Sequence, residues 1–286
     1  MNNTNQTVKR IAIQGGFGAF HEIAAMNYFE NEEIEIVPRS TFKDLFKALK
    51  QGQVDCGITA IENSIAGSIL PNYTLLLESK MKIIGEIYLR IKQNLVVLPG
   101  ETIEKIREVY SHPMAILQCF KFFEDYPHIK LIDSEDTALS AKMIRDNNLK
   151  ATGAISSTLA AKKYQLQILA AGIETNNMNY TRFLILQAKN GDSSQPENVN
   201  KASISFALAH KTGSLSKVLS ILSYYGINLA KIQSMPIIGQ DWDYRFFVDV
   251  EINDYNMYRQ SLDAIRPFID GLHIFGEYLK GKTILE

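Results

Sequence analysis

Strand patterns and helix patterns alternate along the first two thirds of the chain, and this alternation restricts the fold more than any other feature. Short apolar runs, such as residues 10–14 and 34–38, are followed by segments in which apolar residues recur every three to four positions, such as 41–52. This order predicts a parallel-type α/β sheet with helices on its faces. Ligands of such sheets bind beyond the carboxyl ends of strands. Polar residues next to strand ends are therefore the first candidates for a site.

The polar segment 189–201, KNGDSSQPENVNK, contains Gly191 and Pro196 and predicts a linker. It separates a first domain, residues 8–188, from a second, residues 202–280. The second domain has a different predicted order of elements: strand, helix, strand, strand, helix, strand. This βαββαβ order is that of a ferredoxin-like module.

Composition argues against several classes of protein. The chain has 30 Lys and Arg against 31 Asp and Glu, and the resulting net charge of −1 gives no indication of a nucleic-acid or membrane partner. No apolar run approaches the ~20 residues of a membrane span, and residues 1–10 show no signal peptide. Cys56 and Cys119 are far apart and are interpreted as buried small hydrophobes. The two cysteines and the missing signal peptide fit a reducing cytosol, so we expect a cytoplasmic protein. No metal-ligand spacing is present, so we expect no metal site.

Three polar motifs lie next to predicted strand ends. Residues 62–64, Glu-Asn-Ser, follow one strand, and residues 181–182, Thr-Arg, stand directly before an apolar run. Ser111 lies two residues before Pro113 and is predicted to cap the helix that begins at Pro113. Gln118 would lie about two turns along that helix. Each motif alone is also common loop or cap chemistry, so none of them identifies a function by itself.

Together, and in this order, the motifs resemble the prephenate dehydratase family over residues 10–278. Residues 62–64 are similar to its Glu-Asn-Ser signature, and residues 111–113 are similar to the start of a second signature. Residues 179–186, NYTRFLIL, contain its Thr-Arg-Phe motif, which is the most specific of the three. After the linker, residues 226–236 resemble part of an ACT regulatory domain.

The resemblance implies an α/β catalytic part shaped like a two-lobed periplasmic binding protein, with the site in the cleft and no cofactor. The first lobe would hold the start of the chain and the segment that returns to the linker, and the middle of the chain would form the second lobe. The implied catalytic residues are Thr181, Arg182 and Glu62. The implied substrate-binding residues are Asn63, Ser64, Ser111, Gln118 and Phe183.

The chemistry suits these residue types. Prephenate is a dianion with a ring hydroxyl, and the loss of carbon dioxide and water makes its ring aromatic. The protein has to bind two carboxylates and polarise the leaving hydroxyl. Arg182 is suited to a bidentate carboxylate clamp, and Thr181 is placed to donate to the departing hydroxyl. Glu62 would orient its neighbours or carry a proton.

The ACT resemblance implies L-phenylalanine as an effector and a homodimer or homotetramer. The implied effector-binding residues are Gly213, Ser214, Leu215, Asn228 and Leu229. The family usually has Glu and Arg where this chain has Gln233 and Met235. We therefore expect bound phenylalanine to inhibit this chain more weakly than is usual in the family.

The glycine-rich stretch 15–20, GGFGAF, lies between a strand and a helix, where backbone amides can hold an anion. A plain tight turn is the more usual interpretation of such a stretch. The family usually has hydroxyl residues where this chain has Ala19 and His21. His21 could supply a cationic contact in place of one of these hydroxyls.

Two other functions remain open. Arogenate dehydratase performs the same chemistry on a substrate with an amino group in place of the keto group, and the sequence alone does not separate the two. A sensor without catalysis, built from a binding-protein fold and an ACT domain, is the alternative from a different class. The intact Thr-Arg-Phe motif at residues 181–183 argues against the sensor.

Overall fold

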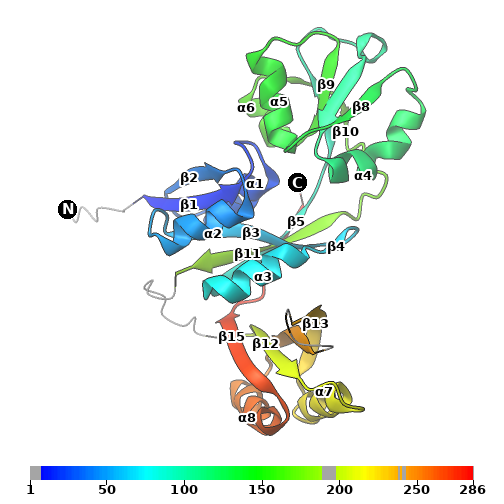
Figure 1. The fold of residues 1–286 in the computed structure, drawn as a ribbon. Coiled ribbons are helices and arrows are strands. Elements are labelled where there is room, and N and C mark those ends of the chain that lie inside the picture. The colour runs from blue at the N-terminus through cyan, green and yellow to red at the C-terminus, as the bar shows by residue number, and fades with distance from the viewer. Residues whose placement is uncertain (1–7, 189–197, 238, 240–242, 286) are drawn as a thin grey trace, which may run out of the picture. The chain divides into compact units, whose positions relative to one another are not determined.

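The computed structural model describes residues 8–188, 198–237, 239 and 243–285, and its chain divides into two compact units (Figure 1). Unit 1 contains residues 1–69, 87–183 and 282–286, and unit 2 contains residues 70–86 and 184–281. Most of the predicted linker, residues 189–197, lies outside the described residues. The domain boundaries expected at residues 188 and 202 therefore stay a prediction.

The larger sheet has seven strands in the order β16-β5-β11-β3-β1-β2, with β4 paired to β3. β1 pairs in parallel with both β2 and β3, as the alternation of strands and helices predicts. Nearly all of β3 is buried, because helices cover both faces of a parallel sheet. The predicted cap of α2 is confirmed, since the Thr41 hydroxyl accepts a hydrogen bond from the Asp44 amide at 3.1 Å. The elements are β1 (Lys9–Gln14), α1 (Phe20–Tyr28), β2 (Ile34–Arg39), α2 (Phe42–Lys50), β3 (Cys56–Asn63), β4 (Gly67–Ser68), β5 (Lys82–Arg90), β11 (Tyr180–Gln187) and β16 (Thr283–Ile284).

A five-stranded sheet, in the order β10-β6-β9-β7-β8, is formed by the middle of the chain. β7 pairs in parallel with β8 and β9, while β6 is antiparallel to β9 and β10. Cys119 packs in its core, and Cys56 lies in the larger sheet; both are buried and free, as expected. The elements are β6 (Asn94–Val97), η1 (Ile103–Lys105), β7 (Glu108–Ser111), α4 (Pro113–Glu124), β8 (Lys130–Asp133), α5 (Thr137–Asp146), β9 (Thr152–Ser156), α6 (Thr158–Lys163) and β10 (Gln167–Ala171).

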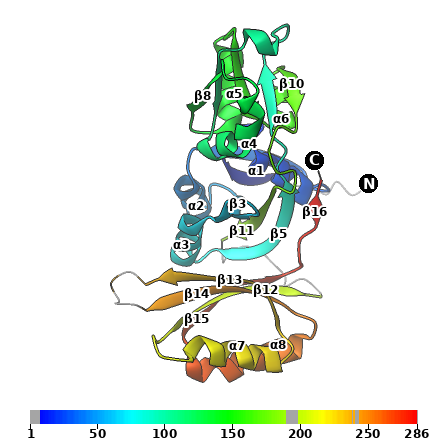
Figure 2. The same cartoon turned by 90° about the vertical axis from the view of Figure 1, so that its right-hand side faces the viewer.

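Unit 2 contains the predicted βαββαβ module, an antiparallel sheet in the order β13-β14-β12-β15. Two helices, α7 and α8, cover one face of this sheet (Figure 2) and bury an apolar cluster that includes Phe206, Val248 and Leu262. On the other face, α3 (Leu70–Ser79) contacts β14 through the Tyr73 and Phe247 rings, whose centroids are 5.0 Å apart. The remaining elements are β12 (Lys201–Leu208), α7 (Ser214–Tyr224), β13 (Asn228–Pro236), β14 (Tyr244–Glu251), α8 (Tyr255–Ile265), η2 (Arg266–Phe268) and β15 (Asp270–Tyr278).

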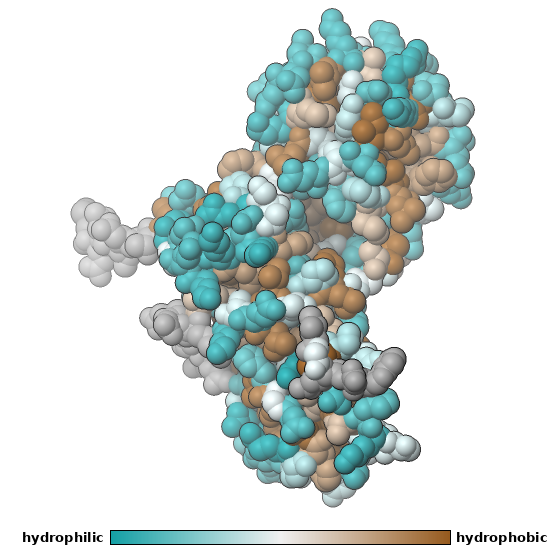
Figure 3. Space-filling view, viewed as in Figure 1, coloured by the Kyte–Doolittle hydropathy of each residue, from teal (hydrophilic) through white to brown (hydrophobic). Residues whose placement is uncertain are grey.

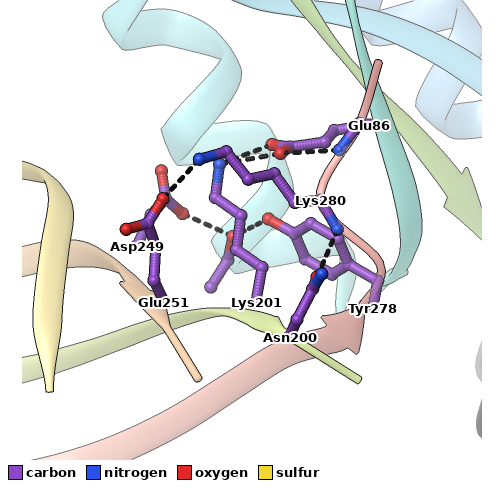
Figure 4. Close-up of polar contacts among 9 residues, drawn as sticks. Glu86, Asn200, Lys201, Asp249, Glu251, Tyr278 and Lys280 are labelled. Atoms are coloured by element: carbon purple, nitrogen blue, oxygen red, sulfur yellow. Dashed lines mark hydrogen bonds and ion pairs between the residues drawn. The ribbon is translucent and has the colours of Figure 1, made fainter. Parts of the chain in front are cut away.

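A buried ion pair joins the start of β12 to β5 within unit 2 (Figure 4). The Lys201 Nζ atom lies 2.7 and 2.9 Å from the two carboxylate oxygens of Glu86, and both side chains are at most 1% exposed. The Gly281 amide donates to the same carboxylate at 3.2 Å. Nearby, the Ser203 hydroxyl donates to the Asp249 carboxylate. Buried charges need such partners, because an unpaired charge in the interior is costly.

Candidate active site

A cavity of about 370 Å³ lies in unit 1, and residues from both sheets line it. Gln14 and Asn63 reach it from the carboxyl ends of the parallel strands β1 and β3, which is where ligands of such sheets bind. Its volume falls in the range of small-molecule sites. The space-filling view shows apolar side chains around a recess in this unit, while hydrophilic residues cover most of the visible surface (Figure 3).

Three helix N-termini reach the cavity wall. Ala19, His112 and Asp136 are the N-caps of α1, α4 and α5, and all three line the cavity. Lining residues include neither Lys nor Arg. The positive ends of helix dipoles and their free backbone amides favour anions. The wall can therefore favour a small anionic ligand without a basic side chain on it.

Thr181 lies on this wall at the start of β11, where only 7% of it is exposed. The Asn63 Nδ2 atom donates to the Thr181 Oγ1 atom at 3.0 Å. Because this oxygen already accepts a bond from Asn63, the hydroxyl proton is directed elsewhere. Thr181 therefore presents a donor in a place where water is largely excluded, as its expected role requires.

Gln118 and Phe183 also line the cavity, and His21 lies against Phe183. The rings of His21 and Phe183 meet edge to face, with centroids 4.9 Å apart, and Phe42 lies on the other side at 5.5 Å. Burial lowers the pKa of His21 to about 3, because the charged form loses its hydration. The expectation of a cationic contact from His21 is therefore wrong for this state of the protein, in which the ring is neutral near pH 7.

Arg182 is not among the residues that line the cavity. Successive side chains of a strand point to opposite faces, so Arg182 faces away from Thr181 and Phe183. Its guanidinium lies 6.0 Å from the centre of the Tyr88 ring, and the residue is 4% exposed. The direct carboxylate clamp stays a prediction that this geometry does not support.

Three further predicted residues lie off the cavity wall, namely Glu62, Ser64 and Ser111. Ser64 connects the loop after β3 to β11, because its hydroxyl donates to the Met178 carbonyl and accepts from the Tyr180 amide, both at 2.9 Å. The Ser111 hydroxyl is fully buried and donates to the Ile155 carbonyl at 2.8 Å. Direct contacts from these three residues to a substrate stay predictions.

The predicted helix cap at Ser111 is wrong. His112 is the N-cap of α4, and its Nδ1 atom accepts a hydrogen bond from the Met114 amide at 3.2 Å. Ser111 is instead the last residue of β7. One position separates the two assignments, and the sequence favours serine only because serine is the more common cap.

In the glycine-rich turn, the backbone amides of two glycines already have hydrogen-bond acceptors within the protein and are not available to an anion. The Gly18 amide donates to the Glu22 carboxylate at 2.6 Å, and the Gly16 amide donates to Asp136 at 3.4 Å. Gly18 has a φ of 90°, which favours glycine. The plain-turn interpretation is therefore confirmed at these positions.

Sequence reasoning missed two polar residues of this region, Asp136 and Asn179. Asp136 caps α5 through the Leu139 amide at 2.8 Å, and burial raises the pKa of its carboxyl group. Asn179 is fully buried just before β11 and bonds to Asn63 and Gln118. The Asp-Thr pattern before a helix is a signal that could have identified the cap, whereas nothing local distinguishes Asn179.

The predicted effector residues fall into two groups at opposite ends of the sheet in unit 2, because Asn228 pairs beside Glu251 whereas Gly213 follows the Leu208 end of β12, which pairs with Tyr244. Gly213 is the N-cap of α7 with a φ of 81°, and Ser214 and Leu215 begin the helix. Asn228 and Leu229 begin β13, and the Asn228 Nδ2 atom donates to the Glu251 carboxylate at 2.6 Å. Further along β13, the Gln233 side chain donates to the Ser234 carbonyl at 2.8 Å.

Within the described residues, no group of three or more His, Cys, Asp and Glu side chains has an arrangement that could hold a metal ion. The helices of the same residues are all too short or too polar to span a membrane.

Comparison with known proteins gives consistent matches. The family model described as prephenate dehydratase matches residues 11–191. A bifunctional chorismate mutase/prephenate dehydratase of Aquifex aeolicus is 34% identical over 95% of this chain and 74% of its own length. Arogenate dehydratase/prephenate dehydratase 2 of Arabidopsis thaliana, a chloroplastic protein, is 35% identical over 99% of this chain and 76% of its own.

A solved structure extends the similarity to the whole fold. The prephenate dehydratase of Arthrobacter aurescens, in complex with L-Phe, has a TM-score of 0.83 at 23% identity. The alignment covers 95% of this chain and 90% of that one. Both the cavity-bearing unit and the C-terminal module therefore have a counterpart in one known architecture.

Proposed function

Because this chain belongs to the prephenate dehydratase family, we propose that it converts prephenate to phenylpyruvate, a step of L-phenylalanine biosynthesis. The observation that carries the proposal beyond family membership is the position of Thr181. Thr181 lines the cavity and its hydroxyl oxygen accepts from Asn63, so the hydroxyl proton is free to be donated to the leaving group. The enzyme is a carbon–oxygen lyase.

The reaction balances without a redox partner. The bond between the ring and its carboxylate breaks, and carbon dioxide leaves. The released electron pair enters the ring and expels the hydroxyl group, which takes up a proton and leaves as water. The protein therefore has to bind two carboxylates, favour the charge on the departing oxygen and exclude bulk water. The helix N-termini at the cavity wall suit the first task, and the Thr181 hydroxyl suits the second.

The direct test is to add prephenate to the purified protein and to follow phenylpyruvate by its absorbance. Product formation supports the lyase, and binding of prephenate without product would favour the sensor. The same assay with arogenate, with phenylalanine as the measured product, compares the two substrates. The Arabidopsis relative carries both activities in its name, so the ratio of kcat/KM for the two substrates decides the preference.

Arg182→Lys separates a structural role of Arg182 from a role in substrate binding. Arg182 is buried on the face of β11 opposite to Thr181, so we expect a lower melting temperature, corresponding to roughly 1–3 kcal/mol, because lysine lacks the planar fork of donors. KM for prephenate should stay close to that of the wild type. A raised KM with an unchanged melting temperature would restore the carboxylate clamp.

We propose that L-phenylalanine binds the ACT-like module of a homodimer or homotetramer. The turn at Gly213 supports this, since its positive φ allows the backbone to come close to a ligand. Inhibition should be weaker than is usual in the family, because Gln233 and Met235 stand where two charges are usual, and allosteric coupling is only about 1–3 kcal/mol.

Phenylalanine titration by calorimetry and by activity tests this expectation. We expect binding heat together with partial or weak inhibition. Absence of binding heat would exclude the effector site, and strong inhibition at micromolar phenylalanine would mean that Gln233 and Met235 do not govern coupling. Light scattering gives the number of subunits in the same samples.

A further inference from the structure

Three amide side chains in unit 1 form a continuous hydrogen-bonded chain, which we call the amide relay: Asn63 and Gln118, which line the cavity, and Asn179, which does not. Asn63 ends β3, Asn179 precedes β11, and Gln118 lies on α4. Asn179 is fully buried and joins the other two. Its Oδ1 atom accepts from Asn63 Nδ2 at 2.7 Å, and its Nδ2 atom donates to Gln118 Oε1 at 2.9 Å.

Backbone amides set the direction of the relay at one end. The Asn63 Oδ1 atom accepts from the Ile65 amide at 3.0 Å and from the Ala66 amide at 2.8 Å. A backbone N–H can only donate, so this atom of Asn63 has to be the oxygen. The Asn63 Nδ2 atom is therefore the one that faces Asn179 and Thr181.

The orientation of Asn63 then fixes which atoms donate and which accept in Asn179 and Gln118. Because Asn179 accepts from Asn63 through its oxygen, it can only donate to Gln118. Gln118 in turn accepts through Oε1, which leaves its Nε2 atom as the end of the relay, on a residue that lines the cavity. Thr181 accepts from Asn63 in the same way. Both polar groups thus present a donor instead of an acceptor to an anionic ligand.

We propose that Asn179 is a positioning residue that holds Gln118 with its N–H group toward the substrate. This inference rests on the proposed function, since it assigns the donor to an anionic group of prephenate. Asn179 contacts Gln118 and Asn63 through its side chain, while its carbonyl accepts from the Ile91 amide at 2.7 Å. The backbone hydrogen bond fixes the position of Asn179. Its side chain links Asn63 at the end of β3 to Gln118 on α4 and so sets the orientation of the Gln118 amide.

Because the members of the amide relay contact different groups, their loss should affect different kinetic constants. Without Asn179, Asn63 still donates to Thr181, so the donor for the leaving hydroxyl is retained. Gln118, however, is free to rotate and to present its oxygen to the anion. Loss of Asn179 should therefore act on substrate binding and leave kcat nearly unchanged.

A double-mutant cycle tests the proposal. Asn179→Ala should raise KM for prephenate by about 10-fold or more, the size expected for one hydrogen bond to a charged group. Gln118→Met, of similar volume but without an amide, should raise KM by a similar factor. In the double variant the two effects should not multiply, because Asn179 acts only through Gln118. Multiplying effects, or an unchanged KM in Asn179→Ala, would overturn the proposal.

Two further measurements separate the possible failures. If the wild-type protein makes no product, the proposed function fails, and the relay is then tested by the side-chain amide signals of Gln118 in an ¹⁵N NMR spectrum. These signals, assigned by their loss in Gln118→Met, should shift in Asn179→Ala. Unshifted signals would overturn the relay. If Asn179→Ala does not fold, Asn179→Ser, which is polar but too short to reach Gln118, replaces it in both experiments.

Discussion

Thr181→Val should lower kcat for prephenate by about 10²-fold or more, the usual loss when one positioned donor to a developing oxyanion is removed. Valine has nearly the same shape as threonine, so the cavity keeps its form. Thr181 is 7% exposed, and its hydroxyl oxygen accepts from Asn63 at 3.0 Å. Removing it leaves the departing oxygen without its donor and leaves Asn63 with one acceptor fewer. Steady-state turnover with prephenate is the measurement.

Thr59→Val is the matched control for Thr181→Val. Thr59 is fully buried on β3 and does not line the cavity, and among the described residues its hydroxyl has no hydrogen-bond partner. Replacement of an unpaired buried hydroxyl by a methyl group should be neutral or stabilising. We therefore expect wild-type kcat for the control. Near-wild-type turnover in a folded Thr181→Val protein would remove Thr181 from the mechanism.

Lys201→Met should lower the free energy of unfolding by about 3–5 kcal/mol, because it leaves the Glu86 carboxylate buried without its cation. The pair is at most 1% exposed, so water cannot replace the lost partner. The double variant Lys201→Met, Glu86→Leu should recover most of this loss, since both charges of the pair are then removed together. Urea unfolding followed by circular dichroism measures both effects.

Lys280→Met is the control for Lys201→Met, because it removes a lysine whose ion pair is exposed instead of buried. Lys280 pairs with Glu251 at 2.6 Å in the same part of the structure, but its side chain is 52% exposed. Exposed pairs contribute about 0–1 kcal/mol, so this variant should unfold at nearly the wild-type urea concentration. A Lys201→Met protein as stable as the Lys280→Met protein would contradict the expected cost of the buried pair.

Local sequence patterns were sufficient for most of the fold. The alternation of strands and helices, the helix cap at Thr41 and the βαββαβ order of the second module each depend on residues close together in the chain. The same holds for the motif at residues 179–186, which resembles the family that the comparisons then established. Such features follow from backbone preferences and from periodic burial, and both can be inferred from neighbouring residues.

Only the folded sheet shows which side of its strand each candidate site residue points to. Thr181 and Arg182 are adjacent in the sequence and appear equally suited to a site, but neighbouring residues of a strand point in opposite directions. Only Thr181 reaches the cavity, while Arg182 lies against Tyr88. The error at Ser111 has a similar origin, because a shift of one residue at the strand end moved the cap to His112.

The sequence by itself determined the order of elements, the family and the residue types that the chemistry requires. The tertiary structure alone decided which of those residues meet. Asn63 and Asn179 are 116 positions apart, yet their side chains bond directly. Burial, which depends on all neighbours at once, keeps His21 neutral. Contacts between distant segments and the loss of water around a group are properties of the folded chain, so no local pattern contains them.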